Sequence, residues 1–260
     1  MMVCVKRLPV LALLAVLVVP AVGSPAAAAD SVPGGAHVTY KNTIVEKKVI
    51  GHSVKGRKIW AFRLGSPSSS KKVLLLAGMH GNETGAVRTL KALRDGDPIT
   101  GADIWVVPVV NPDGVAKNRR QNAHGVDLNR NFSTGWAKAG GATSSGSKAF
   151  SEPESRAIRN LADDIDPTYT ISFHQPLNGI DIRDTGNNAW ARRLAKEIKL
   201  PKKAFDCFSK CHGTYSMWFR KHHKKGAVIT VEMTKHPSKK YLTKTAPLAV
   251  LRSVHAKRQP

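Results

Sequence analysis

Apolar and polar positions along this chain predict short buried strands that alternate with helices. Continuous apolar runs at Lys72–Leu76, Ile104–Val110 and Ala227–Val231 have the length of strands covered on both faces. Apolar residues at helical spacing follow other strands, as in segments 82–93 and 189–198. This alternation is typical of a mixed, mostly parallel twisted sheet with helices on both faces, so we expect a single α/β domain.

Further elements are predicted by the same patterns. Strands are expected at Lys58–Leu64 and Tyr169–Phe173, and helices at 152–163, Tyr215–His222 and 242–255. Ser151 and Glu154 resemble a capping box at the start of the helix over 152–163. We see no internal repeat and no second domain.

The first residues have the pattern of an export signal. Lys6 and Arg7 precede an apolar run, and three alanines ending at Ala29 provide a small-residue cleavage site. We therefore expect a cleaved signal peptide over 1–29, with an uncleaved anchor as the alternative, and one folded domain over 30–260. The protein would be secreted or associated with the cell wall, and it would not stay inserted in a membrane after cleavage.

The cysteines also agree with a protein that acts outside the cytoplasm. Cys207 and Cys211 remain after the signal is removed. Because disulfides persist outside the cytoplasm, a short-loop bridge between them is the simplest interpretation. Two free thiols, or a small metal site that includes His212, are the alternatives, and the spacing does not decide between them.

The chain is strongly basic, with 41 Lys and Arg against 18 Asp and Glu and a net charge of +23. Residues 201–260 contain 14 of these cations and only two acidic residues. This charge favours anionic surroundings, and for an exported protein anionic cell-wall polymers fit it. Nucleic acid is not expected, because no nucleic-acid-binding motif appears and aromatic residues make up only 6%.

Residues with catalytic chemistry stand where predicted strands end. His80 and Glu83 follow one strand, and His174 follows another. Two histidines and one carboxylate form a common catalytic zinc set, which leaves a fourth position for water. Glu232 ends a strand that is too apolar to lie on the surface. Open α/β sheets place their sites at strand ends, so these side chains are expected to converge.

Five ordered motifs resemble the zinc carboxypeptidases of the carboxypeptidase A family. They are H-G-N-E at 80–83, N-P-D-G at 111–114, R-x-N-x-x-G-V-D-L-N-R-N-F at 120–132, F-H at 173–174 and V-I-T-V-E at 228–232. The resemblance spans nearly all of 30–260. It implies the fold of that family and one zinc ion per chain.

The resemblance also implies catalytic roles. His80, Glu83 and His174 would bind zinc. Glu232 would act as the general base, taking a proton from water and later delivering one to the leaving amine. Arg120 would stabilise the oxyanion of the tetrahedral intermediate. The neighbouring Arg119 could exchange roles with it, but the motif spacing selects Arg120.

Other matching residues would hold the substrate or support the metal. Asn129 and Arg130 would bind the substrate's free carboxylate, for which an arginine fork is well shaped. Asp127 would accept a hydrogen bond from the zinc-bound His80. Tyr215 is the only tyrosine upstream of the base in that region, and we expect it to line the pocket. We assign no residue to the role of the family's substrate-binding tyrosine. Asp113 is expected to be a turn residue, and solvated side chains are expected for His124, His212, His222 and His223.

The compact length and segment 174–181 resemble a small bacterial branch of the family, the murein peptide amidases. These enzymes cleave the γ-D-glutamyl–diaminopimelate bond of cell-wall peptides. Asp181 or Asp184 could then meet the ammonium group of diaminopimelate, or merely cap a turn. The alternatives are a general metallocarboxypeptidase acting on protein C-termini, an N-acyl amino-acid deacylase, and a catalytically silent, basic wall-binding protein.

Overall fold

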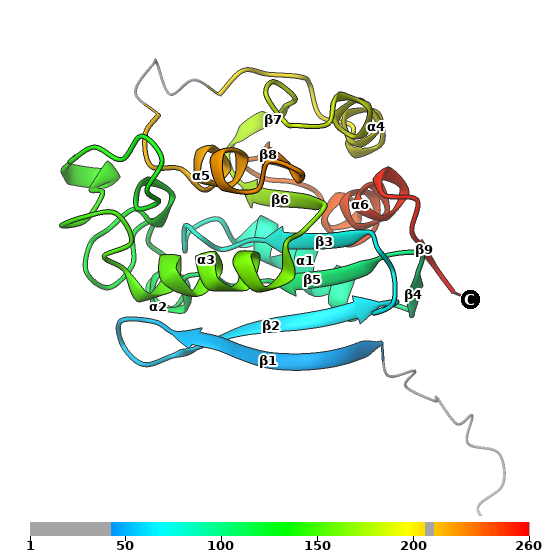
Figure 1. Cartoon of the computed structure of the whole chain (residues 1–260), viewed down its shortest axis with the longest axis horizontal. Helices are drawn as coiled ribbons and strands as arrows, with labels where there is room; N and C mark the ends of the chain where they lie inside the picture. Colours follow the sequence, from blue (N-terminus) through cyan, green and yellow to red (C-terminus); the bar gives the residue numbers. More distant parts are fainter. Residues whose placement is uncertain (1–42, 206–210, 260) are drawn as a thin grey trace, which may run out of the picture. The chain divides into compact units, whose positions relative to one another are not determined.

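Seven strands form one mixed sheet in the order β1-β2-β5-β3-β6-β8-β7 (Figure 1). A computed structural model describes residues 43–205 and 211–259, which all belong to one compact unit, Tyr40–Pro260. The strands are β1 (Ile44–His52), β2 (Lys58–Gly65), β3 (Lys72–Leu76), β5 (Asp103–Val107), β6 (Tyr169–His174), β7 (Leu177–Asp181) and β8 (Ala227–Thr234). Two short strands, β4 (Ile99–Thr100) and β9 (Lys257–Arg258), pair separately.

The centre of the sheet is parallel and its two sides are antiparallel. Strands β5, β3, β6 and β8 pair in parallel, whereas β1–β2, β2–β5 and β7–β8 pair antiparallel. Half of these pairings are therefore parallel, where a mostly parallel sheet was expected. The connections give the reason, because β1 and β2, and likewise β6 and β7, are joined by links too short for a parallel crossover.

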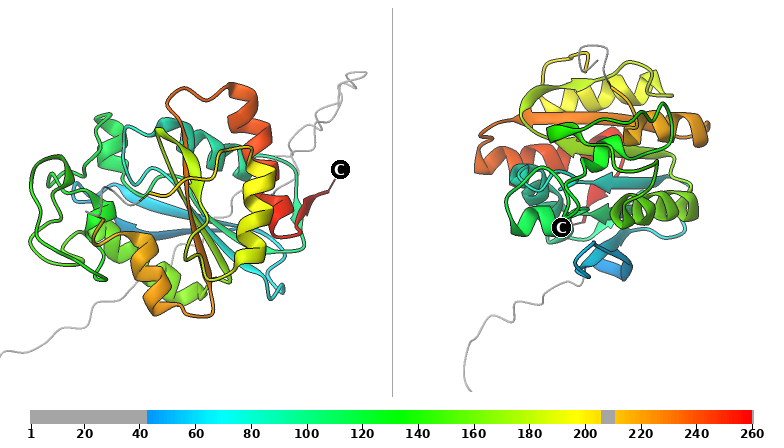
Figure 2. Two further views of the ribbon diagram at one scale, coloured as in Figure 1. Left: turned by 90° about the horizontal axis from the view of Figure 1, so that it is seen from above. Right: turned by 90° about the vertical axis from the view of Figure 1, so that its left-hand side faces the viewer.

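Helices cover both faces of the sheet (Figures 1 and 2). The helices α1 (Thr84–Arg94), α4 (Asn188–Ile198) and α6 (Ala246–Ser253) pack on one face, and α3 (Pro153–Ile165) and α5 (Tyr215–His222) pack on the other. In β3, Val73 and Leu75 join one core cluster while Leu74 and Leu76 join the other. This alternation follows from the two-residue repeat of a strand.

Most elements expected from the sequence are confirmed, and β3 and α5 have the expected bounds. The strand β1 was missed because none of its residues is fully buried, so it carries no continuous apolar run. The C-terminal helix is divided into a π-helical turn, Tyr241–Thr245, and α6. A short helix, α2 (Pro112–Ala116), begins in the N-P-D-G turn.

The expected capping box is wrong. The Ser151 hydroxyl donates to the Glu152 carboxylate, and the N-cap residue of α3 makes no side-chain cap bond. Glu154 is buried instead and accepts hydrogen bonds from the Asn122 side chain and the Val54 backbone N–H. The side chain of Glu154 thus connects α3 to distant segments and does not close its own first turn.

Two expectations fall outside the described residues. Residues 1–29 are not described, so the signal peptide stays a prediction. Cys211 is disulfide-bonded, but Cys207 lies outside the described residues and its pairing with Cys211 stays a prediction too. None of the described helices is long and apolar enough to cross a membrane.

Candidate active site

The parallel centre of the sheet brings distant polar residues to one edge. The carboxyl ends of the neighbouring strands β3, β6 and β8 meet there. His80 follows β3, His174 is the last residue of β6, and Glu232 lies opposite His174 in the register of β8. Residues almost a hundred positions apart in sequence therefore become neighbours.

His80, Glu83 and His174 form a compact buried group, as expected. Their potential ligand atoms all lie within 4.8 Å of one another. The two carboxylate oxygens of Glu83 lie 2.7 Å from Nδ1 of His80 and 3.0 Å from Nδ1 of His174. Two imidazole nitrogens and a carboxylate that face one point match the donor set of a catalytic zinc site, so these residues fit the metal.

The charges around this group also favour a cation. Burial lowers the pKa of His80, but the carboxylates of Glu83 and Asp127 outweigh it and raise that pKa to about 9. Burial raises the pKa of Glu83, but the two histidines lower it to about 2. The same negative surroundings would stabilise a divalent metal ion at this point.

The outer ring nitrogens of both histidines are held by neighbours. Nε2 of His80 lies 2.9 Å from the Asp127 carboxylate, as expected from the sequence. Nε2 of His174 lies 2.8 Å from the hydroxyl of Ser172. Such partners orient metal-binding imidazoles and set their tautomer. The sequence analysis missed Ser172, although its position two residues before His174 on the same strand face could have indicated it.

Arg120 lies at the edge of the metal group. Its Nε and Nη2 donate to one oxygen of Asp127 at 3.0 and 2.7 Å, and its Nη1 lies 3.2 Å from Nδ1 of His80. The neighbouring Arg119 donates to the backbone carbonyls of Gln121 and Asn122. Arg120 lines the pocket and Arg119 does not, in agreement with the motif spacing.

Glu232 also lines this pocket. One of its carboxylate oxygens accepts a hydrogen bond from the Leu177 backbone N–H at 3.3 Å. Burial raises the pKa of Glu232 above its ordinary value, and the nearby negative charge of Glu83 acts in the same direction. A carboxylate with a raised pKa is well suited to accept and return a proton near neutral pH.

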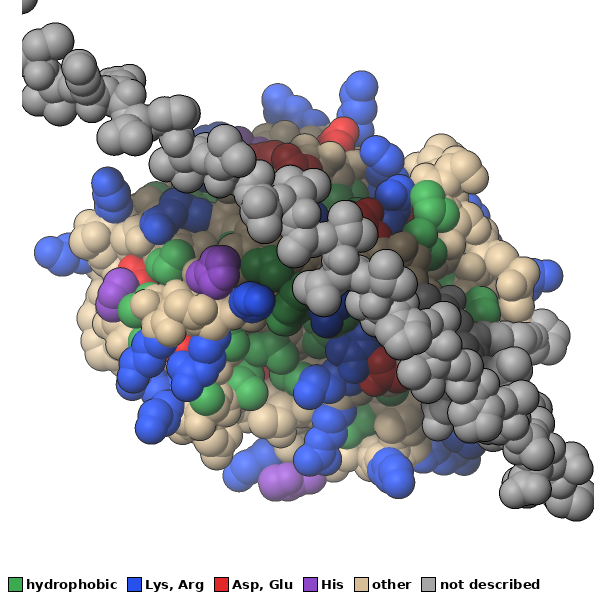
Figure 3. All heavy atoms as spheres, turned by 90° about the horizontal axis from the view of Figure 1, so that it is seen from below, with side chains coloured by type: hydrophobic (Ala, Val, Ile, Leu, Met, Phe, Trp, Pro, Cys, Tyr) green, Lys and Arg blue, Asp and Glu red, His purple; other side chains and the backbone are tan. Residues whose placement is uncertain are grey.

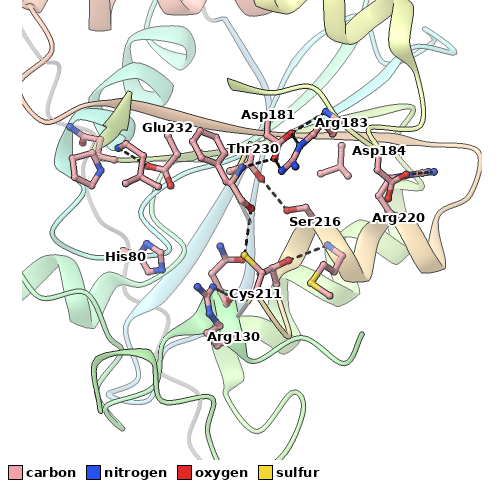
Figure 4. A pocket seen from close by; sticks show the side chains of 18 of the residues that line it. His80, Arg130, Asp181, Arg183, Asp184, Cys211, Ser216, Arg220, Thr230 and Glu232 are labelled. Carbon is pink, nitrogen blue, oxygen red and sulfur yellow. Dashed lines mark hydrogen bonds and ion pairs between the residues drawn. The ribbon is translucent and has the colours of Figure 1, made fainter. Parts of the chain in front are cut away.

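The pocket extends from the metal group toward a second set of charges (Figure 4). His80 and Glu232 lie on one side in this view, and Asp184 and Arg220 lie on the other. The hydroxyls of Ser216 and Thr230 lie between them and are 3.0 Å apart. Sequence reasoning missed Arg220 and Ser216, which lie in no motif, and assigned no role to Thr230, although it lies in the motif at 228–232.

The residues expected to bind substrate mostly line this pocket. Asn129 and Arg130 line it, and Nη1 of Arg130 donates to the Asn129 carbonyl at 2.8 Å. Asp181 lines it too, but its carboxylate accepts hydrogen bonds from the Arg183 guanidinium and from the Phe205 backbone N–H. It also accepts from the Arg183 backbone N–H, so it caps the local turn as well as facing the pocket.

The expectation that Tyr215 lines the pocket is wrong. Its side chain is fully buried, and its hydroxyl lies 2.8 Å from that of Thr170. Its ring packs against those of Phe132 and Phe219 in the core on the α5 side of the sheet. The Tyr215 backbone N–H nevertheless donates to the Asn129 side chain at 3.0 Å and so helps to orient that pocket residue.

Three other expectations concern residues away from the metal group. Asp113 was expected to be a turn residue, but it lies in the first turn of α2, where it is buried and held by the Lys55 N–H and the Arg57 guanidinium. His222 is exposed, as expected. His223, however, is buried, stacked on Phe219, and not solvated. The aromatic side chains of α5 explain the difference, because the His223 ring packs against Trp218 and Phe219.

Comparison with known proteins agrees with this geometry. The zinc carboxypeptidase family matches residues 36–178, more than half of the chain. The chain therefore belongs to the zinc carboxypeptidase family.

Individual relatives lie in the same family. Murein peptide amidase A of Escherichia coli strain K12 is 38% identical over 152 residues, which cover 52% of this chain and 62% of that protein. Murein peptide amidase A of Vibrio campbellii is 32% identical over 165 residues, covering 58% and 65%. The matches thus span somewhat less than two thirds of these relatives.

The chain is also similar to solved structures over most of its length. The murein-tripeptide amidase of Escherichia coli O157 superposes with a TM-score of 0.64 at 32% identity, covering 79% of this chain and 92% of that one. A carboxypeptidase A of Helicoverpa armigera gives a TM-score of 0.63 at 19% identity, covering 82% and 68%. The second likeness concerns the fold alone.

Proposed function

We propose that this protein is a zinc-dependent metallopeptidase that hydrolyses an amide bond next to a free carboxylate. The observation that carries the proposal is the convergence of His80, Glu83 and His174 with Glu232 and Arg120 at one sheet edge. Each has the chemistry that amide hydrolysis needs, and family membership supports the same activity.

The side chains divide the reaction between them. His80, Glu83 and His174 would hold the zinc ion, which would supply a Lewis acid for the scissile carbonyl and would lower the pKa of a water molecule. Glu232 accepts the proton of the attacking water and later donates a proton to the leaving amine. Arg120 stabilises the negative charge that develops on the carbonyl oxygen, and its two hydrogen bonds to Asp127 fix the guanidinium in advance.

The finer proposal is that the substrate is a cell-wall peptide and the bond is γ-D-glutamyl–diaminopimelate. The relatives named murein peptide amidase support this substrate class. Asn129 and Arg130 offer an amide and a guanidinium to the carboxylate beside the scissile bond.

The far side of the pocket supports the same substrate. It is lined by two pairs of opposite charges, Asp181 with Arg183 at 2.8 Å and Asp184 with Arg220 at 3.4 Å. The distal end of diaminopimelate carries both an ammonium and a carboxylate, so it can meet charges of both signs. A lysine end carries only the ammonium, and an apolar C-terminal residue carries neither. This feature favours the amidase over a general carboxypeptidase.

We further propose that the protein acts outside the cytoplasm, either secreted or associated with the wall. The support is the pattern of residues 1–29 in the sequence. It would place the enzyme where cell-wall peptides occur.

A parallel digestion followed by mass spectrometry tests the proposal. The purified protein receives L-Ala-γ-D-Glu-diaminopimelate, the same tripeptide with lysine in the last position, and ordinary C-terminal L-peptides. Each is incubated with zinc, with a chelator, and with zinc restored after chelation. We expect chelator-sensitive release of diaminopimelate that greatly exceeds release of lysine.

The other outcomes separate the alternatives. Release of ordinary C-terminal residues would identify a general carboxypeptidase. Cleavage of N-acyl amino acids alone, added as a fourth substrate, would identify a deacylase. No cleavage by the zinc-loaded protein would favour the silent wall-binding protein and would refute the proposal.

A further inference from the structure

A second feature, separate from the active-site pocket, is a groove between α1 and the segment that precedes α6. Its rim carries Arg88 and Lys91 from α1 and Lys239 from the opposite side. The apolar residues Ala92, Pro237 and Leu242 also line it. Thr243 completes the lining. We call this feature, defined by these seven residues, the basic groove.

The cations of the basic groove have no acidic partners among the residues that the structure describes. Arg88, Lys91 and Lys239 are exposed and form no ion pair in the described part of the chain. No acidic residue is among the described residues that line the groove. Arg63, by contrast, is paired with Asp103.

The charge continues beyond the rim. Lys235, Lys240 and Lys244 are exposed on the same chain segment and likewise have no ion pair among the described residues. Like charges that are held close together repel one another, and an anionic partner would relieve this repulsion. The whole chain has 41 Lys and Arg against 18 Asp and Glu, and blue Lys and Arg side chains are spread over the face drawn in Figure 3, so net charge alone does not distinguish the groove. Its concave shape and apolar lining do.

The lining indicates what kind of anion fits. Cationic groups along the rim suit phosphates, while the half-buried Ala92 and Pro237 offer carbon surface to the units between them. No aromatic side chain is among the described residues that line the groove, so it lacks the stacking platforms that single-stranded nucleic acids use. A polymer of polyol or sugar phosphates matches both properties.

The two walls of the basic groove are joined close to the catalytic edge. The Gln175 side chain accepts hydrogen bonds from the N–H groups of Gly85 and Ala86 at the start of α1. It also donates to the Thr234 carbonyl at the end of β8, which leads into the other wall. A polymer held in the groove would therefore lie on the same elements that supply Glu83 and Glu232.

We propose that the basic groove binds a polyol-phosphate polymer and thereby keeps the protein on an anionic matrix. This inference does not depend on the proposed catalytic activity, because binding can be measured without turnover. The net charge suggests an anionic partner without saying where it binds, and this proposal places that partner in the basic groove.

Binding of poly(glycerol phosphate) to the purified chain, measured by fluorescence anisotropy at about 50 mM salt, tests this inference. The test variant is Arg88→Glu/Lys91→Glu/Lys239→Glu. The control is Lys221→Glu/Lys224→Glu/Lys225→Glu, which makes the same change in net charge at exposed lysines outside the groove. We expect about a hundredfold weaker binding for the groove variant, because each cation near an anionic surface contributes about a factor of five. The control should lose less than about tenfold.

Salt dependence provides a second readout. The slope of log affinity against log salt should fall by about one unit for each groove cation removed. The neutral variant Arg88→Gln/Lys91→Gln/Lys239→Gln replaces the charge-reversal variant if the latter does not fold, as judged by thermal unfolding.

Three outcomes would overturn the inference. Equal weakening by the groove and control variants would mean that only net charge attracts the polymer. Tighter binding of a single-stranded oligonucleotide with the same number of phosphates would indicate a nucleic-acid site. Absence of binding at low salt would leave the groove a solvated surface. Loss of peptide hydrolysis with binding retained would contradict the proposed function and not this inference.

Discussion

The charged side chains of the active-site pocket and those of the basic groove differ in whether they have partners. Around the metal group Glu83, Asp127 and Arg120 each contact a partner of opposite charge or a histidine. In the basic groove, Arg88 and Lys91 have no acidic partner among the described residues. The comparison shows that the position of each charge matters in the active site, whereas the number of like charges matters in the basic groove.

Burial explains the difference. A charge removed from water is costly unless it is paired and hydrogen-bonded, so the buried metal group with Asp127 tolerates only one arrangement of its side chains. Exposed cations stay hydrated and are screened by salt, so the groove tolerates several like charges. The pocket should therefore respond sharply to single substitutions, and the groove should respond to ionic strength.

The largest effect is expected for Glu232→Gln, which keeps the shape of the side chain but removes the base. Hydrolysis should fall by on the order of 1,000-fold or more, since a general acid–base catalyst contributes about 100- to 10,000-fold. Zinc content, measured by elemental analysis, should stay at one ion per chain. Near-wild-type turnover would exclude Glu232 as the base.

Arg130→Ala is expected to have the next largest effect. Loss of a charged hydrogen-bond donor costs about 1.5–3 kcal/mol, so kcat/KM for substrates with a free carboxylate should fall by about ten- to a hundredfold. Matched substrates with an amidated terminus should lose much less. An equal loss on both substrates would show that Arg130 does not read the carboxylate.

Asp113→Asn tests, away from the catalytic edge, whether a buried charge is stabilised by its hydrogen-bonded partners. It should lower the free energy of unfolding by about 1–3 kcal/mol at pH 7, because the Lys55 N–H and the Arg57 guanidinium lose a charged partner. Burial raises the pKa of Asp113, but these partners lower it more, to below its ordinary value. Its contribution is thus present above the unfolded pKa of about 3.9 and is lost as the pH falls through the lower folded pKa.

Denaturation curves at several pH values check this prediction. The difference between Asp113→Asn and the parent chain should shrink as the pH falls below about 4. A difference that stays constant down to pH 2 would mean that the charge of Asp113 is not what stabilises the turn.

Tyr215→Phe tests the placement of this residue in the core. The hydroxyl lies against that of Thr170, so its removal should lower the free energy of unfolding by about 1 kcal/mol. The KM for the tripeptide should change by less than about twofold, because the side chain does not line the pocket. A large rise in KM with unchanged stability would restore the pocket role.

The smallest effect is expected from salt. Raising the salt concentration from about 50 to 500 mM should change turnover of the isolated tripeptide by less than about threefold, because buried pairs are screened far less than exposed ones. The same change should release a polymer from the basic groove. If tripeptide turnover fell in parallel with polymer binding, the pocket and the groove would not be independent.

Much of the fold and the metal group could be predicted from the sequence. Continuous apolar runs marked β3 and β8, and catalytic residue types at their ends marked His80 and Glu232. The strand β1 was not predicted, because a half-buried strand has no apolar run. Ser172 was not predicted as the hydroxyl partner of His174, because a lone serine carries no motif. Tyr215 was misplaced because its sequence neighbours do not show which way the first turn of α5 faces.

The sequence by itself determined the class of chemistry, since the ordered motifs that contain His80, Glu83, His174 and Glu232 resemble those of a family of zinc-dependent hydrolases. Only the tertiary structure decided which charges meet. The pair Asp184–Arg220 at the far side of the pocket depends on how strands and helices pack, and so does the rim of the basic groove, which has no ion pair among the described residues. The physical reason is that periodicity records whether a side chain is buried, whereas electrostatic partners are set by distances between segments far apart in the chain.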